Sequence, residues 1–101
     1  MNRQLAFPFI SNTLTIHGFH ANVVGPGWFY PDHSHTSFEL LYCWGGEATE
    51  WLDDYPILFE RGDWLLIPPG VKHKTLNKNK DYFTYISLLF DTDNIHFLKK
   101  L

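Results

Sequence analysis

The sequence predicts an all-β domain built from antiparallel strands. Apolar residues recur at every second position over most of the chain, which is the period of a strand and not of a helix. Clusters of Gly, Pro, Asn and Asp interrupt these runs at short intervals, and such residues favour tight turns. Together these observations indicate short strands joined by short connections, as in a compact barrel or sandwich.

Seven strands follow from the apolar runs. They are expected at Leu14 to His20, Ser37 to Trp44, Ala48 to Leu52, Pro56 to Phe59, Asp63 to Ile67, His73 to Leu76 and Tyr82 to Phe90. The turns expected near or between them are Gly25-Pro26-Gly27, Gly45-Gly46, Asp53-Asp54, Arg61-Gly62 and Pro68-Pro69-Gly70. Pro68 and Pro69 have no backbone donor, so they end the strand that precedes them.

The pattern of apolar residues at the two ends of the chain differs from that in the middle. We assign the middle, residues 14–92, to a single barrel. Residues 1–13 are expected to form an amino-terminal arm or an edge strand. After Phe90, Asp93 or Asn94 can cap a helix, whose apolar residues are spaced by three. Residues 93–101 therefore predict the start of a carboxy-terminal helix. A helix this short is marginal alone, so we expect the natural chain to continue.

Composition limits the classes of partner and compartment. The length of 101 residues fits one hydrophobic core. A net charge of −3 argues against direct binding of nucleic acid, which requires clustered cations. The single cysteine, Cys43, cannot form an internal disulfide, and the start of the chain lacks the apolar run of a secretory signal, so a cytoplasmic location is expected. No apolar run approaches the ~20 residues that span a bilayer, so no membrane partner is expected.

Four residues have the chemistry of a metal site. On a strand, alternate side chains share a face, so His33 and His35 point the same way, and Glu39 follows if the strand has no bulge. His73 would come from a later strand. Imidazole and carboxylate ligands suit Fe, Mn, Ni, Zn or Cu and do not choose among them. The structural alternative is a polar surface loop in which Glu39 makes an ordinary salt bridge, and an isolated His-x-His would favour that alternative.

The spacing of these residues resembles the two sequence motifs of the cupin superfamily. Gly27, His33-Ser34-His35, Glu39 and Gly46 match the first motif, and Gly62, Pro68-Pro69-Gly70, His73 and Asn77 match the second, with 15 residues between the two motifs. This resemblance implies a single cupin barrel, also called a double-stranded β-helix or jelly roll, here followed by the short helix. In that frame Gly46 and Gly62 are expected at turns that require positive φ or close backbone approach.

Longer stretches are similar to the sensor domain of AraC-type transcription regulators. These stretches run from His33 to Tyr42, from Glu60 to His73 and from Tyr82 to Phe90. The resemblance implies a small-molecule effector inside the barrel, a homodimer formed through an adjoining helix, and DNA binding by a carboxy-terminal pair of helix-turn-helix motifs. These 101 residues contain no such DNA-binding segment, so this interpretation depends on a longer natural chain.

Four aromatic residues are candidates to stack on a ring of the effector, with core packing as the alternative for each. They are Trp28, Tyr42, Trp44 and Trp64.

Two other interpretations stay open at this point. Members of the regulator family often keep only part of the metal pattern, whereas this chain keeps all four ligand positions. A stand-alone cupin metalloenzyme, of the dioxygenase or sugar isomerase type, would use a divalent transition metal such as Fe, Mn, Ni or Zn as Lewis acid or oxygen activator. A barrel that serves only for dimerisation is also compatible with the sequence.

Overall fold

The computed structural model describes residues 14–93, and this part of the chain contains eight strands. They are β1 (Leu14–Val24), β2 (Phe29–His33), β3 (Phe38–Gly45), β4 (Glu47–Leu52), β5 (Tyr55–Glu60), β6 (Trp64–Ile67), β7 (His73–Leu76) and β8 (Phe83–Thr92). Each of the seven predicted strands overlaps one of these. The predicted arm at 1–13, and the predicted helix beyond its first residue Asp93, lie outside the described residues.

The sequence did not predict β2. Pro31 lies in the middle of this five-residue strand, and most of its side chains are exposed, so it lacks a clear apolar alternation. Among the strands of residues 14–93 it lies at the edge of its sheet and pairs with β7 alone, in a register that shifts between Tyr30 and His33. This segment is therefore a strand because it pairs with β7, and not because its own sequence alternates between apolar and polar residues.

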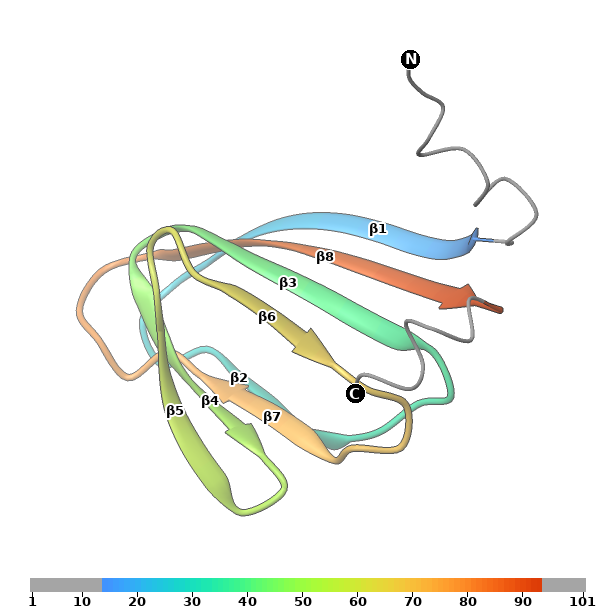
Figure 1. Ribbon diagram of the computed structural model, residues 1–101. Coiled ribbons are helices and arrows are strands. Elements are labelled where there is room, and N and C mark those ends of the chain that lie inside the picture. The colour runs from blue at the N-terminus through green and yellow to red at the C-terminus, as the bar shows by residue number, and fades with distance from the viewer. Residues whose placement is uncertain (1–13, 94–101) are drawn as a thin grey trace.

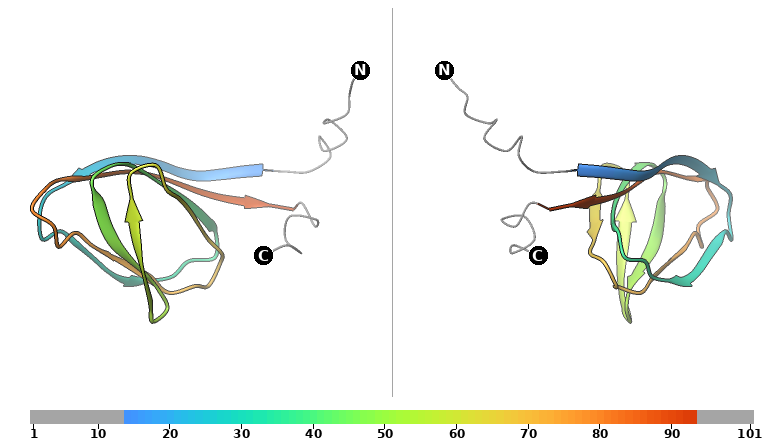
Figure 2. Two further views of the ribbon diagram at one scale, coloured as in Figure 1. Left: turned by 60° about the vertical axis from the view of Figure 1, so that its left-hand side comes forward. Right: turned by 90° about the vertical axis from the view of Figure 1, so that its right-hand side faces the viewer.

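Two four-stranded antiparallel sheets face each other (Figure 1). One has the order β1-β8-β3-β6 and the other β2-β7-β4-β5. The long β1–β8 pair extends beyond the rest of the barrel (Figure 2). Because neighbouring strands come from distant parts of the sequence, residues far apart in the chain meet on the inner faces.

The hydrophobic core fills one end of the barrel and leaves the other end open for a cavity. Cys43 and Leu41 belong to the buried cluster with Ala48, Phe59, Ile67 and Phe83, and Leu41 also lines the cavity. Glu39, the next inward position along β3, lines the cavity. The inner face of one strand thus runs from core to site within five residues.

Asn77 ties the end of β7 to the first turn of the barrel. It is fully buried, and its Nδ2 donates to the carbonyls of Gly25 and Asp81, each at 3.0 Å. Its backbone carbonyl accepts from the Gly27 N–H, and its N–H donates to the Trp28 carbonyl. This residue therefore links the two motif regions by hydrogen bonds, and its role is structural.

Gly46 shows why one turn requires glycine. Its φ is +73°, and a Cβ built there would lie 2.2 Å from the Tyr82 carbonyl oxygen. The sequence expectation of positive φ or close backbone approach is confirmed at this position, since both conditions hold.

Residues 14–93 include no helix long and apolar enough to cross a membrane.

Candidate functional site

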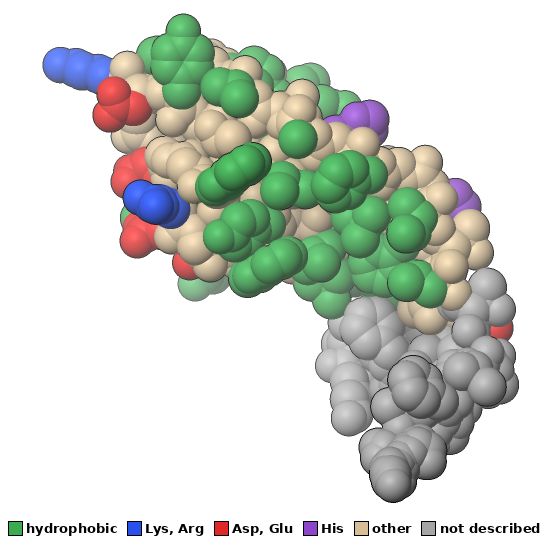
Figure 3. All heavy atoms as spheres, turned by 90° about the horizontal axis from the view of Figure 1, so that it is seen from above, with side chains coloured by type: hydrophobic (Ala, Val, Ile, Leu, Met, Phe, Trp, Pro, Cys, Tyr) green, Lys and Arg blue, Asp and Glu red, His purple; other side chains and the backbone are tan. Residues whose placement is uncertain are grey.

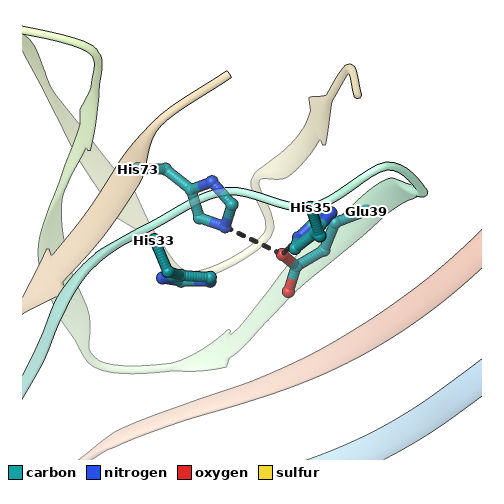
Figure 4. A group of neighbouring side chains, drawn as sticks. All are labelled: His33, His35, Glu39 and His73. Carbon is teal, nitrogen blue, oxygen red and sulfur yellow. Dashed lines mark hydrogen bonds and ion pairs between the residues drawn. The ribbon is translucent and has the colours of Figure 1, made fainter. Parts of the chain in front are cut away.

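The four predicted metal ligands lie together, but not because they share one strand. His33 ends β2 in one sheet, Glu39 lies on β3 in the other, and His35 lies in the connection between them. The prediction that strand parity orients all three is therefore wrong. They converge because the chain crosses from one sheet to the other between His33 and Glu39, and the crossing turns all three inward (Figure 4).

His73 completes the group from β7. It pairs directly with His33 in the β2–β7 register, and their ring centroids lie 3.9 Å apart. The centroids of His35 and His73 are 5.1 Å apart. His73 is buried, whereas the other three residues are partly exposed toward the cavity.

Backbone carbonyls orient all three imidazole rings through Nδ1. His33 Nδ1 lies 3.1 Å from the Pro31 oxygen, His35 Nδ1 lies 2.9 Å from the Ser37 oxygen, and His73 Nδ1 lies 2.9 Å from the Val71 oxygen. A carbonyl only accepts, so each Nδ1 carries a proton. In the neutral ring this leaves Nε2 as a free lone pair, which is the arrangement that metal-binding histidines use.

Glu39 lies at the centre of the cluster. Its Oε1 is 3.1 Å from Nε2 of both His35 and His73, and Ser87 Oγ donates to its Oε2 at 2.6 Å. If a ring is neutral and its proton is on Nδ1, its Nε2 is a hydrogen-bond acceptor. Nε2 and the Glu39 carboxylate would then be two acceptors in contact, which repel each other. A cation must therefore lie between Glu39 and the imidazoles, either a proton on Nε2 or a metal ion.

The charges in the cluster support one another. Burial disfavours the charge on Glu39, but hydrogen bonds from His73, Ser87 and His35 outweigh burial and hold the pKa of Glu39 to about 2. Burial also disfavours a charged His73, yet the contacts with Glu39 and the Val71 carbonyl outweigh it, so the pKa of His73 lies above 6.5. Burial lowers the pKa of His33, because the contact with the Pro31 carbonyl does not compensate for it.

The donor set fits a divalent transition metal. One ligand atom from each of the four residues lies within 4.8 Å of the others. Metal–nitrogen bonds of about 2.1 Å place opposite ligands about 4 Å apart, so small side-chain rotations bring all four into bonding range. The cluster of His33, His35, Glu39 and His73 can therefore hold a metal ion, which would supply Lewis acidity or redox chemistry when bound.

The cluster opens into a cavity of about 470 Å³ between the two sheets. This volume is in the range of small-molecule sites. Its lining residues come from six of the eight strands and from two loops: His20, Asn22, Val24, Trp28, Tyr30, His33, His35, Glu39, Leu41, Glu50, His73, Thr75, Tyr85, Ser87 and Leu89. The mixture of aromatic walls and convergent polar groups suits a small organic ligand, and none of these residues is Lys or Arg.

The structure places the four aromatic candidates differently. Trp28 lines the cavity, with its ring centroid 5.9 Å from that of Tyr85. Tyr42, Trp44 and Trp64 do not line it and lie on the outer face. Glu39, Leu41 and Cys43 occupy the inward positions of β3, so Tyr42 and Trp44 must point outward. Tyr42 packs on Trp64 with ring centroids 4.5 Å apart, and Trp44 and Trp64 are 61% and 65% exposed.

Sequence reasoning missed several residues of the cavity wall, most notably Glu50, Thr75 and Ser87. Ser87 holds Glu39, and Glu50 accepts a hydrogen bond from Thr75 Oγ1. Glu50 and Ser87 are polar residues at inward positions of strands whose other inward residues are apolar or aromatic, and Thr75 follows His73 on the inward face of β7. These polar residues are visible in the sequence, but only the strand register shows that they face the cavity.

A protein-family model described as the AraC-like ligand binding domain matches residues 19–100. No curated protein matches the chain.

Solved structures with the same fold include several cupins. A Cupin 2 conserved barrel domain protein from Salinispora arenicola is 27% identical, with 72% of this chain and 61% of that chain covered and a TM-score of 0.68. A predicted oxalate decarboxylase from Thermotoga maritima is 20% identical, with 74% and 66% covered and a TM-score of 0.71. A salicylate 1,2-dioxygenase variant from Pseudoaminobacter salicylatoxidans is 24% identical, with 85% and 24% covered and a TM-score of 0.69.

The chain thus spans less than two thirds of the length of each of these three proteins. The likenesses confirm the predicted cupin barrel.

Proposed function

The chain belongs to the family of AraC-like ligand-binding domains, and from this premise we propose that it is the small-molecule-sensing and dimerisation domain of an AraC-type transcription regulator. The observation that carries the proposal is the cavity of about 470 Å³, which lies inside the matched region and gathers polar groups against aromatic walls. In this proposal the barrel binds the small-molecule effector and a separate helix-turn-helix domain binds DNA.

The net charge of the chain supports the assignment of ligand binding to the barrel and of DNA binding to a separate domain. A net charge of −3 gives the barrel no general attraction for phosphate, so DNA contact would come from another part of a longer protein. The test has two parts. The gene should continue beyond Leu101 with roughly a hundred residues holding two helix-turn-helix patterns. The present chain alone should not shift DNA in a gel, and tight, salt-sensitive binding by it would contradict the proposal.

We propose further that His33, His35, Glu39 and His73 bind a divalent transition metal, with Fe, Mn, Ni and Zn as candidates. The convergence of the Nε2 atoms on Glu39, with every Nδ1 engaged by a carbonyl, supports this assignment. Because a proton and a metal compete for Nε2, metal should be lost as pH falls through the histidine range near ~6.5.

Elemental analysis tests the metal proposal directly. Protein supplied with each metal in turn should retain one ion per chain at pH 8. His73→Ala removes one ligand and should weaken binding at least about a hundredfold. His20→Ala is the matched control, because His20 also lines the cavity but does not belong to the cluster. Equal metal content in wild type and His73→Ala would contradict the proposal.

The cluster also favours a second candidate function, a stand-alone cupin metalloenzyme of the dioxygenase or sugar isomerase type. Four protein ligands on a six-coordinate ion leave two positions for a substrate, as such an enzyme requires. The two functions differ in turnover. Oxygen uptake with salicylate, or carbon dioxide release from oxalate, by the metal-loaded chain and not by His73→Ala would favour the enzyme. Reversible ligand binding with no turnover would favour the sensor.

A further inference from the structure

A second carboxyl group faces the cavity from the wall opposite Glu39. Glu50 lies on β4 beside Thr75 of β7, and both residues line the cavity. The Glu50 side chain is 1% exposed, and Thr75 Oγ1 donates to its Oε1 at 2.5 Å. Its Oε2 has no hydrogen-bond partner among residues 14–93. An unpaired buried oxygen costs about 1–3 kcal/mol, so this atom offers binding capacity that the protein itself leaves unused.

Glu50 is hydrogen-bonded to Thr75 and not to the metal cluster, although the charges of His73 and Glu39 act on its pKa. Both oxygens of Glu39 are engaged, Oε1 by His35 and His73 and Oε2 by Ser87. Glu39 belongs to β3 in one sheet, whereas Glu50 and Thr75 belong to the facing sheet. A ligand in the cavity can therefore contact Glu50 while the cluster keeps its own contacts.

The surroundings of Glu50 define the chemistry of its partner. The cavity wall contains no Lys or Arg, so a ligand carboxylate would find no side-chain ion pair there. The charges of Glu39 and its cation cancel when the cation is a proton and sum to a positive charge when it is a divalent metal, so the cluster gives a ligand ammonium no attraction. Burial raises the pKa of Glu50 to about 7, so both protonation forms are present near neutrality. A hydroxyl group can accept from the acid and donate to the carboxylate, so it suits both forms.

We propose that Glu50, held by Thr75, is the hydrogen-bond anchor that recognises a hydroxyl group of an uncharged ring-shaped ligand in the cavity. Trp28, Tyr30 and Tyr85 supply aromatic faces for such a ring. This inference rests on the proposed ligand-binding function and names the class of ligand together with one residue that selects it.

Three probes that share a ring and differ in the head group test the assignment. They are benzyl alcohol, benzylamine and benzoate, titrated by ligand-observed NMR against wild type, Glu50→Gln and Glu50→Leu, after chelation and again with Zn²⁺ supplied. Benzyl alcohol should bind wild type best in chelated protein. Glu50→Leu should weaken it about tenfold, whereas Glu50→Gln, which keeps a donor and an acceptor, should stay within a few-fold. Zn²⁺ should not change this dependence on Glu50.

The controls separate failure of the anchor from failure of the ligand-binding function. Thermal unfolding of each variant confirms that it folds, and Leu89→Trp, which fills the cavity, should abolish binding of every probe. Benzyl alcohol binding that Glu50→Leu leaves unchanged but Leu89→Trp abolishes would refute the anchor and keep the cavity as a ligand site. Stronger Glu50-dependent binding of benzylamine would refute the uncharged class. Probe binding that Leu89→Trp does not affect would contradict the ligand-binding function as well.

Discussion

At the scale of single residues, the metal-type cluster depends on short-range backbone contacts. Each of the three histidines places Nδ1 on a carbonyl two residues away in the chain, at Pro31, Ser37 and Val71. Such local contacts fix the orientation of each ring and present Nε2 to the centre of the cluster. Ser87 orients Glu39 from a fourth strand, β8. The cluster is therefore arranged for a cation whether a metal or a proton occupies it.

Glu50 gives the protein a stability that depends on pH. Its pKa in the folded state, about 7, lies above the ordinary 4.5 because burial disfavours the charge. The folded state thus binds the proton more tightly, and this group costs stability as pH rises from 4.5 through 7. Glu50→Gln should be up to about 3 kcal/mol more stable than wild type at pH 8, with the advantage vanishing near pH 4.5. Urea unfolding of chelated protein at both pH values measures the difference.

Glu47→Gln is the control for this prediction, because Glu47 is an exposed carboxylate on the same strand. Surface charges contribute little, so its effect should stay within about 1 kcal/mol at either pH. A stability difference for Glu50→Gln that does not change between pH 4.5 and 8 would show that Glu50 does not titrate as its burial requires.

At the scale of elements, β3 shows what the sequence could and could not predict. Glu39, Leu41 and Cys43 alternate along β3 and face inward, as the period of two that predicted this strand requires. The same alternation places Tyr42 and Trp44 on the outer face of the barrel. The prediction that they contact a ligand was therefore incompatible with the predicted strand that contains them. The motif spacing identified all four cluster residues, because each lies at a fixed distance from a turn. The route by which they meet could not be predicted, since it depends on a crossing between sheets.

The turn between β3 and β4 provides a test of backbone constraint. Gly46→Ala would add a Cβ 2.2 Å from the Tyr82 oxygen at a φ of +73°. The atoms that this Cβ would meet are backbone atoms at the entry to β8 and cannot move easily, so we expect a loss of at least about 3 kcal/mol in the free energy of unfolding. Gly62→Ala is the matched control. Its φ is +91° but no atom lies within 4 Å of the added Cβ, so it should lose only about 1–2 kcal/mol. Chemical denaturation compares the two, and equal losses would contradict the close approach at Gly46.

At the scale of the whole molecule, the outer face of the β1-β8-β3-β6 sheet is apolar (Figure 3). Phe19 and Val23 on β1 are 63% and 66% exposed, and they share this face with Leu14, Ile16, Trp44 and Trp64. By the register of the strands, no outward position of β1 from Phe19 to Val23, or of its partners on β8, carries a charge. Exposed apolar patches of this kind mark interfaces.

The proposed homodimer should use this apolar outer face. The double variant Phe19→Asp/Val23→Asp places two charges in it and should convert a dimer to a monomer in light scattering, because burying unpaired charge is costly. Tyr55→Asp is the control, since Tyr55 is an equally exposed aromatic residue on β5 in the other sheet. A dimer that survives the double variant would place the interface elsewhere, and a wild-type chain that is monomeric at high concentration would argue against a dimer of this domain.

The central claim is that the cavity around the histidine cluster binds a small molecule. Ligand-observed NMR with a mixture of small metabolites, on wild type and two single variants, tests it most directly. Leu89 lines the cavity, whereas Leu88 is the adjacent outward position on the same strand. We predict at least one ligand that binds wild type and Leu88→Trp alike and is lost in Leu89→Trp, which fills the cavity. Binding that persists in Leu89→Trp, or no binding by the wild type, would contradict the claim.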